Sequence, residues 1–372
     1  MAWIVLSGLM GGCSGGGSIT SGNGGGPVPE VAFAIDGNAN TVSVFTVDTT
    51  IGTWTPIGTI ATGTKPLAVA LHPSGKFLYV ANFNSANISA YNIDPTTGAL
   101  TAMMGSPFAA VNAPQALAID SSGNFLYVST LTAAMPPVHV LSGYSINATT
   151  GALTLIAQPN VPADTTPVGL TFAPTTEFLY AADMNNNVLG FSAHAATGVL
   201  APVPGNPFAA GTMPFGIVAH PTGKFVYVTN IISGDVSGYL VDALTGRLTP
   251  VPMSPFTSGT SPGPIPATIA VEPTGKFLYV VNAGEADISE YSIDATSGAL
   301  APLTTSPFVL PAGTILLRMA VDPTGTFLYV VNFSGNNISI FMIQSNGSLN
   351  PMGTTLMGAG ATSGIAFRAG HP

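Results

Sequence analysis

Cysteine and charge are both scarce in this sequence. One cysteine, Cys13, occurs in 372 residues, so an internal disulfide is excluded. Charged residues make up 6% of the chain, against about a quarter of an average soluble domain. There are seven Lys and Arg, the net charge is -9, and no basic cluster exists. Electrostatic binding of nucleic acid or of an anionic lipid surface is therefore excluded.

Long apolar runs and helical periodicity are also missing. Beyond the N-terminus no apolar run approaches the roughly eighteen residues that a membrane-spanning helix needs. No segment has apolar residues at helical spacing between helix caps. Glycine and proline are abundant instead, with 44 and 32 residues, and 46% of the chain is hydrophobic. This composition is typical of many short strands joined by turns around a large core.

The N-terminus differs from the rest of the chain. Its apolar run, Ala2 to Met10, leads through small residues to Cys13, which resembles a bacterial lipoprotein signal with a lipidated cysteine. A secretory signal with an incidental cysteine is the alternative. The Gly- and Ser-rich stretch that follows predicts a flexible tether. We expect an exported bacterial protein, in the cell envelope or secreted, that meets the membrane only through this lipid anchor. The predicted parts are a signal peptide at 1–13, a tether at 14–30 and one folded unit at 31–372.

A heptapeptide recurs along the chain. "KFLYVAN" begins at Lys76, and close copies begin at Lys224, Lys276 and Thr326. The aromatic residue of this motif returns every 46 to 53 residues, a period typical of a solenoid, a propeller or an array. The aligned aromatic residues are Phe33, Tyr79, Tyr127, Tyr180, Tyr227, Tyr279 and Tyr329.

Each repeat predicts four short antiparallel strands. In the second repeat the apolar stretch 66–73, the motif strand 77–82, the alternating stretch 87–94 and the stretch 99–104 are separated by Gly-containing turns. Seven such sheets predict an all-β, seven-bladed β-propeller of four-stranded antiparallel blades. The first repeat lacks its first strand, and Ser363 to Gly370 resembles a first strand without a successor. We therefore expect this C-terminal strand to complete the first blade and close the ring.

These motifs point to a known family. The segments "YVTN", "YVAN" and "YVVN", with P-x-G-K-F-x-Y-V before them, resemble the seven-bladed lactonase-type propellers of the YVTN family over roughly residues 31–370. That family is similar to bacterial 6-phosphogluconolactonase and carboxymuconate-lactonising enzymes. The resemblance implies a ligand site around the central channel. The resemblance also implies on which face this site lies. It is the face that carries the loops between second and third strands and the connections between blades.

Three residues are candidates for catalysis on that face. The resemblance implies Arg-His after the proline that opens a first strand, and Glu after the asparagine that ends a second strand. This sequence departs from both patterns, although Arg318 stands at the His position and would stabilise an oxyanion. Glu285, followed by Asp287, lies in the loop after one such asparagine, and His139 enters a third strand after the corresponding loop. The alternatives are solvated loop carboxylates and a histidine with a structural role.

Polar residues end the second strand of every repeat. Such Asn and Asp side chains either bond the backbone of the following loop or form a polar rim that binds a sugar-like ligand. Lys65 and Arg318 are the cations placed to face an anion there. No two histidines have metal-ligand spacing, so we predict no metal and no cofactor. The candidate ligand-binding residues are Lys65, Asn82, Asp183, Asn230, Asn282 and Asn332.

A second motif closes four of the repeats. It reads "GSPF", "GNPF", "MSPF" and "TSPF". An aromatic stripe is one interpretation, since aromatic rings stack on carbohydrate. Recurrence once per blade favours packing between neighbouring blades. The residues concerned are Phe108, Phe208, Phe256 and Phe308.

The sequence is compatible with two functions and does not decide whether the protein is an enzyme. The departures from the family pattern favour a monomeric, surface-tethered module that binds a small polar ligand, a glycan or a cell-surface protein. The resemblance and Arg318 favour a lactone hydrolase that acts at the channel mouth. A phosphosugar substrate agrees poorly with export and with so few cations.

Overall fold

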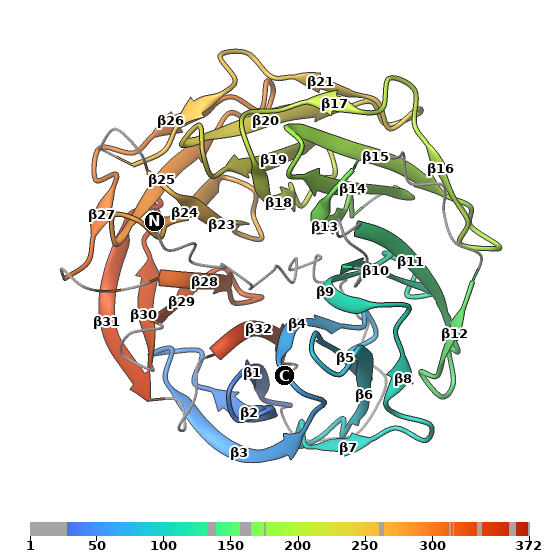
Figure 1. Cartoon of the computed structure of the whole chain (residues 1–372). Helices are drawn as coiled ribbons and strands as arrows, with labels where there is room; N and C mark the ends of the chain where they lie inside the picture. The colour runs from blue at the N-terminus through green and yellow to red at the C-terminus, as the bar shows by residue number, and fades with distance from the viewer. Residues whose placement is uncertain are drawn as a thin grey trace, which may run out of the picture.

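The chain folds into seven separate antiparallel sheets arranged as blades around a central channel (Figure 1). This computed structural model describes residues 28–131, 139–156, 165–174, 176–259, 264–311, 314, 316–332, 337–356 and 362–370. The predicted class, an all-β seven-bladed propeller, is confirmed. Cys13 lies outside the described residues. Within them, no helix has the length and apolar character of a membrane crossing.

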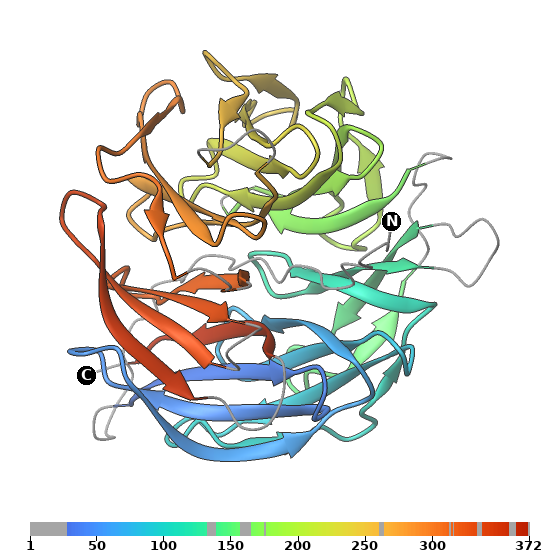
Figure 2. The ribbon, with the colours of Figure 1, turned by 60° about the vertical axis from the view of Figure 1, so that its left-hand side comes forward.

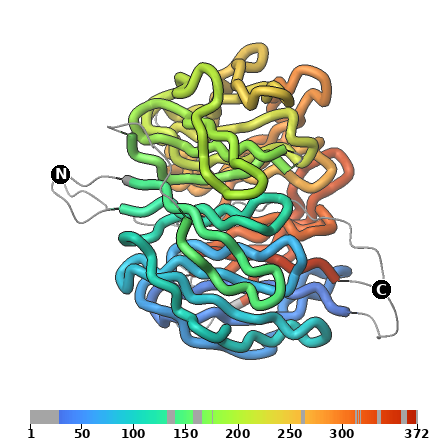
Figure 3. The backbone as a smooth tube through the Cα atoms, turned by 90° about the vertical axis from the view of Figure 1, so that its right-hand side faces the viewer, coloured from blue at the N-terminus to red at the C-terminus, as the bar shows by residue number. Residues whose placement is uncertain are grey.

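Blade 1 combines the two ends of the chain. Its innermost strand, β32, pairs with β1 from Val31 opposite Arg368 to Asp36 opposite Thr362, as predicted for the ring closure. The two strands lie side by side in Figures 2 and 3, in red and blue. β1 begins one residue before the predicted boundary, because Glu30 already pairs with Val47. The strands of blade 1 are β32 (Thr362–Arg368), β1 (Glu30–Asp36), β2 (Thr41–Val47) and β3 (Trp54–Ala61).

The other six blades run outward from the channel in chain order. Blade 2 contains β4 (Pro66–Leu71), β5 (Phe77–Asn82), β6 (Asn87–Ile93), β7 (Leu100–Ala102) and β8 (Phe108–Ala109). Blade 3 contains β9 (Ala113–Ile119), β10 (Phe125–Leu131), β11 (His139–Ile146) and β12 (Leu153–Leu155). Blade 4 contains β13 (Pro167–Phe172), β14 (Phe178–Asp183), β15 (Asn187–Ala193), β16 (Leu200–Pro202) and β17 (Phe208–Ala209).

The remaining three blades repeat the same order. Blade 5 contains β18 (Pro214–Ala219), β19 (Phe225–Asn230), β20 (Asp235–Val241), β21 (Leu248–Pro250) and β22 (Phe256–Thr257). Blade 6 contains β23 (Pro266–Val271), β24 (Phe277–Asn282), β25 (Asp287–Ile293), β26 (Leu300–Pro302) and β27 (Phe308–Val309). Blade 7 contains β28 (Leu316–Val321), β29 (Phe327–Asn332), β30 (Asn337–Ile343) and β31 (Leu349–Leu356).

The proline–phenylalanine motif splits the outer strand of four blades in two. In blade 2 the peptide before Pro107 is cis, and Ser106 Oγ accepts a hydrogen bond from the Ala90 amide at 2.9 Å. The hydroxyl thus satisfies a third-strand amide at the break, and β8 then resumes pairing with β6. The predicted packing between blades is confirmed, since Phe208 and Phe256 are buried in inter-blade clusters and Phe108 and Phe308 pack against such clusters.

The core consists of seven apolar layers, one between each pair of neighbouring blades. The tyrosine of the repeated motif is buried in six of these layers, and its hydroxyl donates to a glycine carbonyl of the next blade. That glycine has a positive φ, and at Gly246 an added Cβ would lie 2.5 Å from the Phe178 ring. The motif therefore joins blades as well as forming strands. The pairs are Tyr79–Gly151, Tyr127–Gly198, Tyr180–Gly246, Tyr227–Gly298, Tyr279–Gly347 and Tyr329–Gly52.

Candidate functional site

The face implied by the family resemblance carries the ends of all second strands, and we call it the candidate face. In blade 2, Asn82 pairs both with Pro66 at the start of β4 and with Asn87 at the start of β6. The loop between second and third strands and the connection between blades therefore meet on this face. The residues that define it are Asp36, Asn82, Thr130, Asp183, Asn230, Asn282 and Asn332.

Four of the predicted ligand-binding residues form the same internal network. In blade 6 the Asn282 amide nitrogen donates to Asp287 Oδ1 at 2.6 Å and to Ser289 Oγ at 2.8 Å. Ser289 Oγ also accepts from the Gly259 amide, so the network ties the incoming connection to the hairpin. The corresponding amide donors in the other blades are Asn82, Asn230 and Asn332.

Burial limits what these asparagines can offer to a ligand. Their exposure is between 0% and 7%, and their amide hydrogens are used inside the hairpin. Asp183 holds a loop in a similar way, since it accepts from the amide and the hydroxyl of Thr166 and from the Asn185 amide. The structure therefore gives these side chains loop-holding contacts, and their contact with a ligand stays a prediction.

Lys65 lies on the candidate face between the first two blades. Its φ is 56°, and its amide donates to Asn40 Oδ1 of blade 1 at 2.7 Å. Its carbonyl accepts from the Phe83 amide of blade 2. The residue is half-buried. These contacts explain why the connection from blade 1 to blade 2 turns here, and the anion-binding role of the amino group stays a prediction.

Glu285 and Asp287 form a carboxyl pair on the candidate face. Asp287 is 2% exposed, so the alternative interpretation as a solvated loop carboxylate is wrong for this residue. Burial raises the pKa of Asp287 to about 6, the Asn282 hydrogen bond opposes this rise, and the charge and hydrogen bonding of Glu285 add to it. Glu285 itself is half-buried and lies over Gly259 and Pro264 of the incoming connection. The pair can therefore hold or release a proton near neutral pH.

Arg318 lies deeper than the rim of the candidate face. It pairs with Val331 on β29, one step beyond a β-bulge that follows Leu316. Its Nε donates to the Ser363 carbonyl on β32 at 3.1 Å, across the seam between blade 7 and blade 1. The side chain is 6% exposed, and burial lowers its pKa to about 9. At neutral pH this guanidinium is therefore a charged group inside the wall of the ring.

His139 opens β11 and pairs with Leu131. This register places its backbone at the candidate face, while its side chain is not among the described ones. Two other histidines lie in the turns of the opposite face, where His72 Nε2 bonds the Gly123 carbonyl and His220 Nε2 the Gly275 carbonyl of the next blade. They are structural links between blades. In the described part of the chain no three His, Cys, Asp or Glu side chains gather as a metal site would require.

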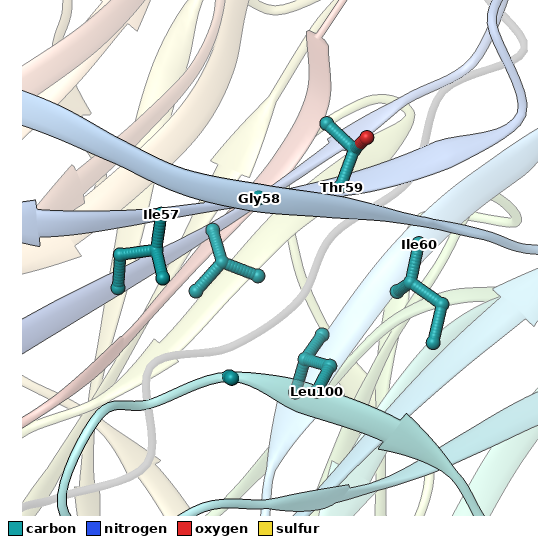
Figure 4. A pocket seen from close by; sticks show the side chains of 7 residues that line it. Ile57, Gly58, Thr59, Ile60 and Leu100 are labelled. Atoms are coloured by element: carbon teal, nitrogen blue, oxygen red, sulfur yellow. The ribbon is translucent and has the colours of Figure 1, made fainter.

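An apolar groove lies away from the channel, between the outer strands β3 and β7 (Figure 4). Apart from the Thr59 hydroxyl its lining side chains are aliphatic, and none of them titrates. It therefore adds no chemistry to the candidate face. The lining residues are Val44, Ile57, Gly58, Thr59, Ile60, Ala99 and Leu100.

The sequence analysis did not predict two features of these sites, the burial of Asp287 and the burial of Glu290. Asp287 is buried as part of the hydrogen-bond network around Asn282. A sequence signal for this network exists, since an Asn or Asp stands five residues after the Asn that ends the second strand. Glu290 is fully buried on β25, where blade 2 has Ala90. Its Oε2 accepts from Thr305 and its Oε1 from the Leu349 amide of blade 7. Its burial could not be inferred because the partner lies in another blade.

The chain matches the model of a known family. The model of the family "Lactonase, 7-bladed beta-propeller" matches residues 30–112, 101–213 and 171–363, and the chain belongs to this family. A search of curated proteins found no match.

Solved structures with the same fold are distant in sequence. One is the periplasmic gluconolactonase of Pseudomonas aeruginosa, 18% identical, with a TM-score of 0.77 over 91% of this chain and 99% of that chain. Another is a candidate 6-phosphogluconolactonase from Bacteroides uniformis, 19% identical, with a TM-score of 0.74 over 91% and 99%. A third, from Lactobacillus plantarum, is 21% identical, with a TM-score of 0.74 over 92% and 99%. At these identities the likeness establishes the fold.

Proposed function

We propose that this chain is an exported lactone hydrolase that acts at the candidate face. The observation that carries the proposal is the Glu285–Asp287 carboxyl pair, because hydrolysis at neutral pH needs a base that is ionised there. Membership of the lactonase family supports the reaction class. The similarity to a periplasmic gluconolactonase, together with the N-terminal apolar run before Cys13, supports export.

In this proposal the half-buried Glu285 carboxylate takes a proton from water once the carboxyl pair has lost the proton that it holds at lower pH. The hydroxide equivalent attacks the lactone carbonyl carbon and forms a tetrahedral oxyanion. When this intermediate collapses, the ring C–O bond breaks and the carboxyl group returns the proton to the leaving alkoxide. The product is the open hydroxy acid. Few cations are available on this face, which favours a lactone without phosphate.

A second candidate is a tethered binding module for a small polar ligand, a glycan or a cell-surface protein. The observation that favours it is the use of the asparagine amide hydrogens as loop supports, which makes these donors unavailable to a reacting substrate. In this alternative Cys13 carries a lipid, the folded unit is monomeric, and the loops of the candidate face make the contact. The two candidates differ in one measurable property, since only the hydrolase would turn over a lactone.

The test is hydrolysis of a lactone panel by the full-length chain, followed by pH-stat. The Glu285→Gln variant removes the base and should reduce kcat/KM by about 100-fold, a typical loss for a general base. Glu177→Gln is the matched control, since Glu177 is exposed in a turn of the opposite face. Absence of turnover on every lactone, with the fold intact, would contradict the hydrolase and leave the binding module.

A further inference from the structure

The inner strand of blade 7 carries a long charged side chain, Arg318, at a level where five of the other blades have small residues. Arg318 follows the bulge of β28, the innermost strand of blade 7. In five of the other six innermost strands the first paired residue after the bulge is alanine, glycine or threonine, and in blade 5 it is Ile217. The five small residues are Ala68, Ala116, Gly169, Thr268 and Gly364.

The direction of the side chain at this position is the same in two blades. In blade 4 a Cβ added to Gly169 would lie 2.5 Å from the Phe215 carbonyl on the innermost strand of blade 5. In blade 7 Arg318 Nε donates to the Ser363 carbonyl on the innermost strand of blade 1. The guanidinium therefore lies at the seam between blade 7 and blade 1. The two strands of this seam, β28 and β32, lie beside the central channel (Figure 1).

The free edge of this guanidinium has no partner among the described residues. Nη1 and Nη2 are both buried and make no hydrogen bond. No carboxylate contributes to the shift of the Arg318 pKa, which burial alone causes. Of the sixteen acidic residues only Asp164 lies outside the described ranges, and its place in the chain is between blades 3 and 4. A buried, unpaired cation is costly, and the cost is relieved by an anion bound from solution.

We propose that the free edge of Arg318 binds a small carboxylate anion inside the channel, at the seam between blade 7 and blade 1. Because Nε is used by Ser363, the two Nη groups remain as a parallel pair of donors, which matches the two oxygens of a carboxylate. The Ser363 hydroxyl donates to the Pro66 carbonyl and so helps to fix the strand that positions Arg318.

This inference is independent of the hydrolase proposal, because binding is measured without turnover. The experiment is a titration of the full-length chain with sodium formate and sodium acetate at pH 7 and constant ionic strength, followed by calorimetry and by the unfolding temperature. Sodium chloride serves as the reference anion. We expect saturable binding of one carboxylate per chain and a rise of the unfolding temperature with carboxylate concentration.

Three variants make the result specific. Arg318→Met removes the charge and should abolish saturable binding. Arg318→Lys keeps a charge without the paired donors and should weaken binding about tenfold, the equivalent of one lost charge-assisted hydrogen bond. Arg247→Met is the matched control, since Arg247 is exposed and its loss should leave carboxylate binding unchanged.

The proposal is overturned by any of three results. One is an absence of saturable carboxylate binding in the wild-type chain. Another is an equal carboxylate affinity of the wild-type chain and the Arg318→Lys variant. This variant keeps the positive charge, so it still gives a test if Arg318→Met fails to fold. The third is an equal effect of chloride and acetate, which would show that the site binds a spherical ion and does not recognise a carboxylate.

Discussion

The hydroxyl of Tyr329 donates a 2.9 Å hydrogen bond to the carbonyl of Gly52, across 277 positions of sequence. It joins the last blade to the first and belongs to the same series as five other tyrosine–glycine pairs along the ring. Blade 1 has Phe33 at this position, without a hydroxyl. The ring is therefore closed by the chemistry that also joins its internal blades, in addition to the strand pairing of β1 with β32.

Tyr329→Phe should lower the free energy of unfolding by about 1–2 kcal/mol. The change removes one hydrogen bond and leaves the buried Gly52 carbonyl without its donor. Urea unfolding followed by fluorescence measures the loss. Tyr227→Phe is the matched control inside the ring, and an equal loss is expected there. A Tyr329→Phe chain as stable as the wild type would contradict a role of this bond in closure.

Glu30 should make the chain less stable as the pH rises from about 4.5 to about 8. Burial and, less strongly, the charge of Asp322 raise the pKa of Glu30 from 4.5 to about 8. Over this window the folded chain holds a proton that the unfolded chain has released, so deprotonation favours unfolding. The effect is on the order of a few kcal/mol. Unfolding temperatures at a series of pH values measure it.

Glu30→Gln should flatten this pH dependence, because the amide stays neutral at every pH in the window. Glu177→Gln replaces an exposed carboxylate and should leave the slope of the wild type unchanged. If the Glu30→Gln chain kept the wild-type slope, another group would be responsible for it.

Glu290→Ala should destabilise the interface between blades 6 and 7 by about 2 kcal/mol. The change leaves the Leu349 amide and the Thr305 hydroxyl without their acceptor in a buried layer. Urea unfolding gives the loss, and hydrogen exchange at the Leu349 amide should become faster. Glu290→Gln keeps an oxygen acceptor and is expected to lose less than half as much. Unchanged exchange at Leu349 in the alanine variant would refute the contact.

If the chain is a hydrolase, kcat/KM should fall as the pH is lowered through about 6, because the carboxyl pair must lose its proton to act as a base. In Asp287→Asn the group whose pKa is raised to about 6 is gone, so the acid limb at this pH should be lost. The variant should fold, since blade 7 has Asn337 in the same contact with Asn332. An acid limb at the same pH in both proteins would show that another group titrates.

Much of the fold follows from the sequence because its signals are local. Strand alternation, turns with glycine at positive φ and the spacing of the aromatic residues repeat in each blade, so strands, blade number and the C-terminal closing strand were all predicted correctly. The signature asparagine was also placed correctly at the end of the second strand. Its amide bonds to residues five and seven positions later, which lie within reach of a single hairpin.

The candidate site was harder to predict because its chemistry depends on neighbouring blades. Arg318 was singled out from the sequence, but its burial and its contact with Ser363 arise only when β28 and β32 meet at the seam. Asp287 had a solvated loop carboxylate as one interpretation, but it is 2% exposed and accepts from Asn282, in the network that also binds Gly259 of the incoming connection. Glu290 had no sequence signal, because its acceptor role depends on an amide 59 positions away.

The sequence by itself determined the repeating blade, the number of blades and the way the ring closes, since each of these depends on short-range periodicity and turn chemistry. Only the tertiary structure decided which ionisable groups are buried and with what partners. The reason is physical. Desolvation and hydrogen bonding at Glu30, Asp287, Glu290 and Arg318 are set by packing between blades, and that packing brings together residues that the chain keeps tens to hundreds of positions apart.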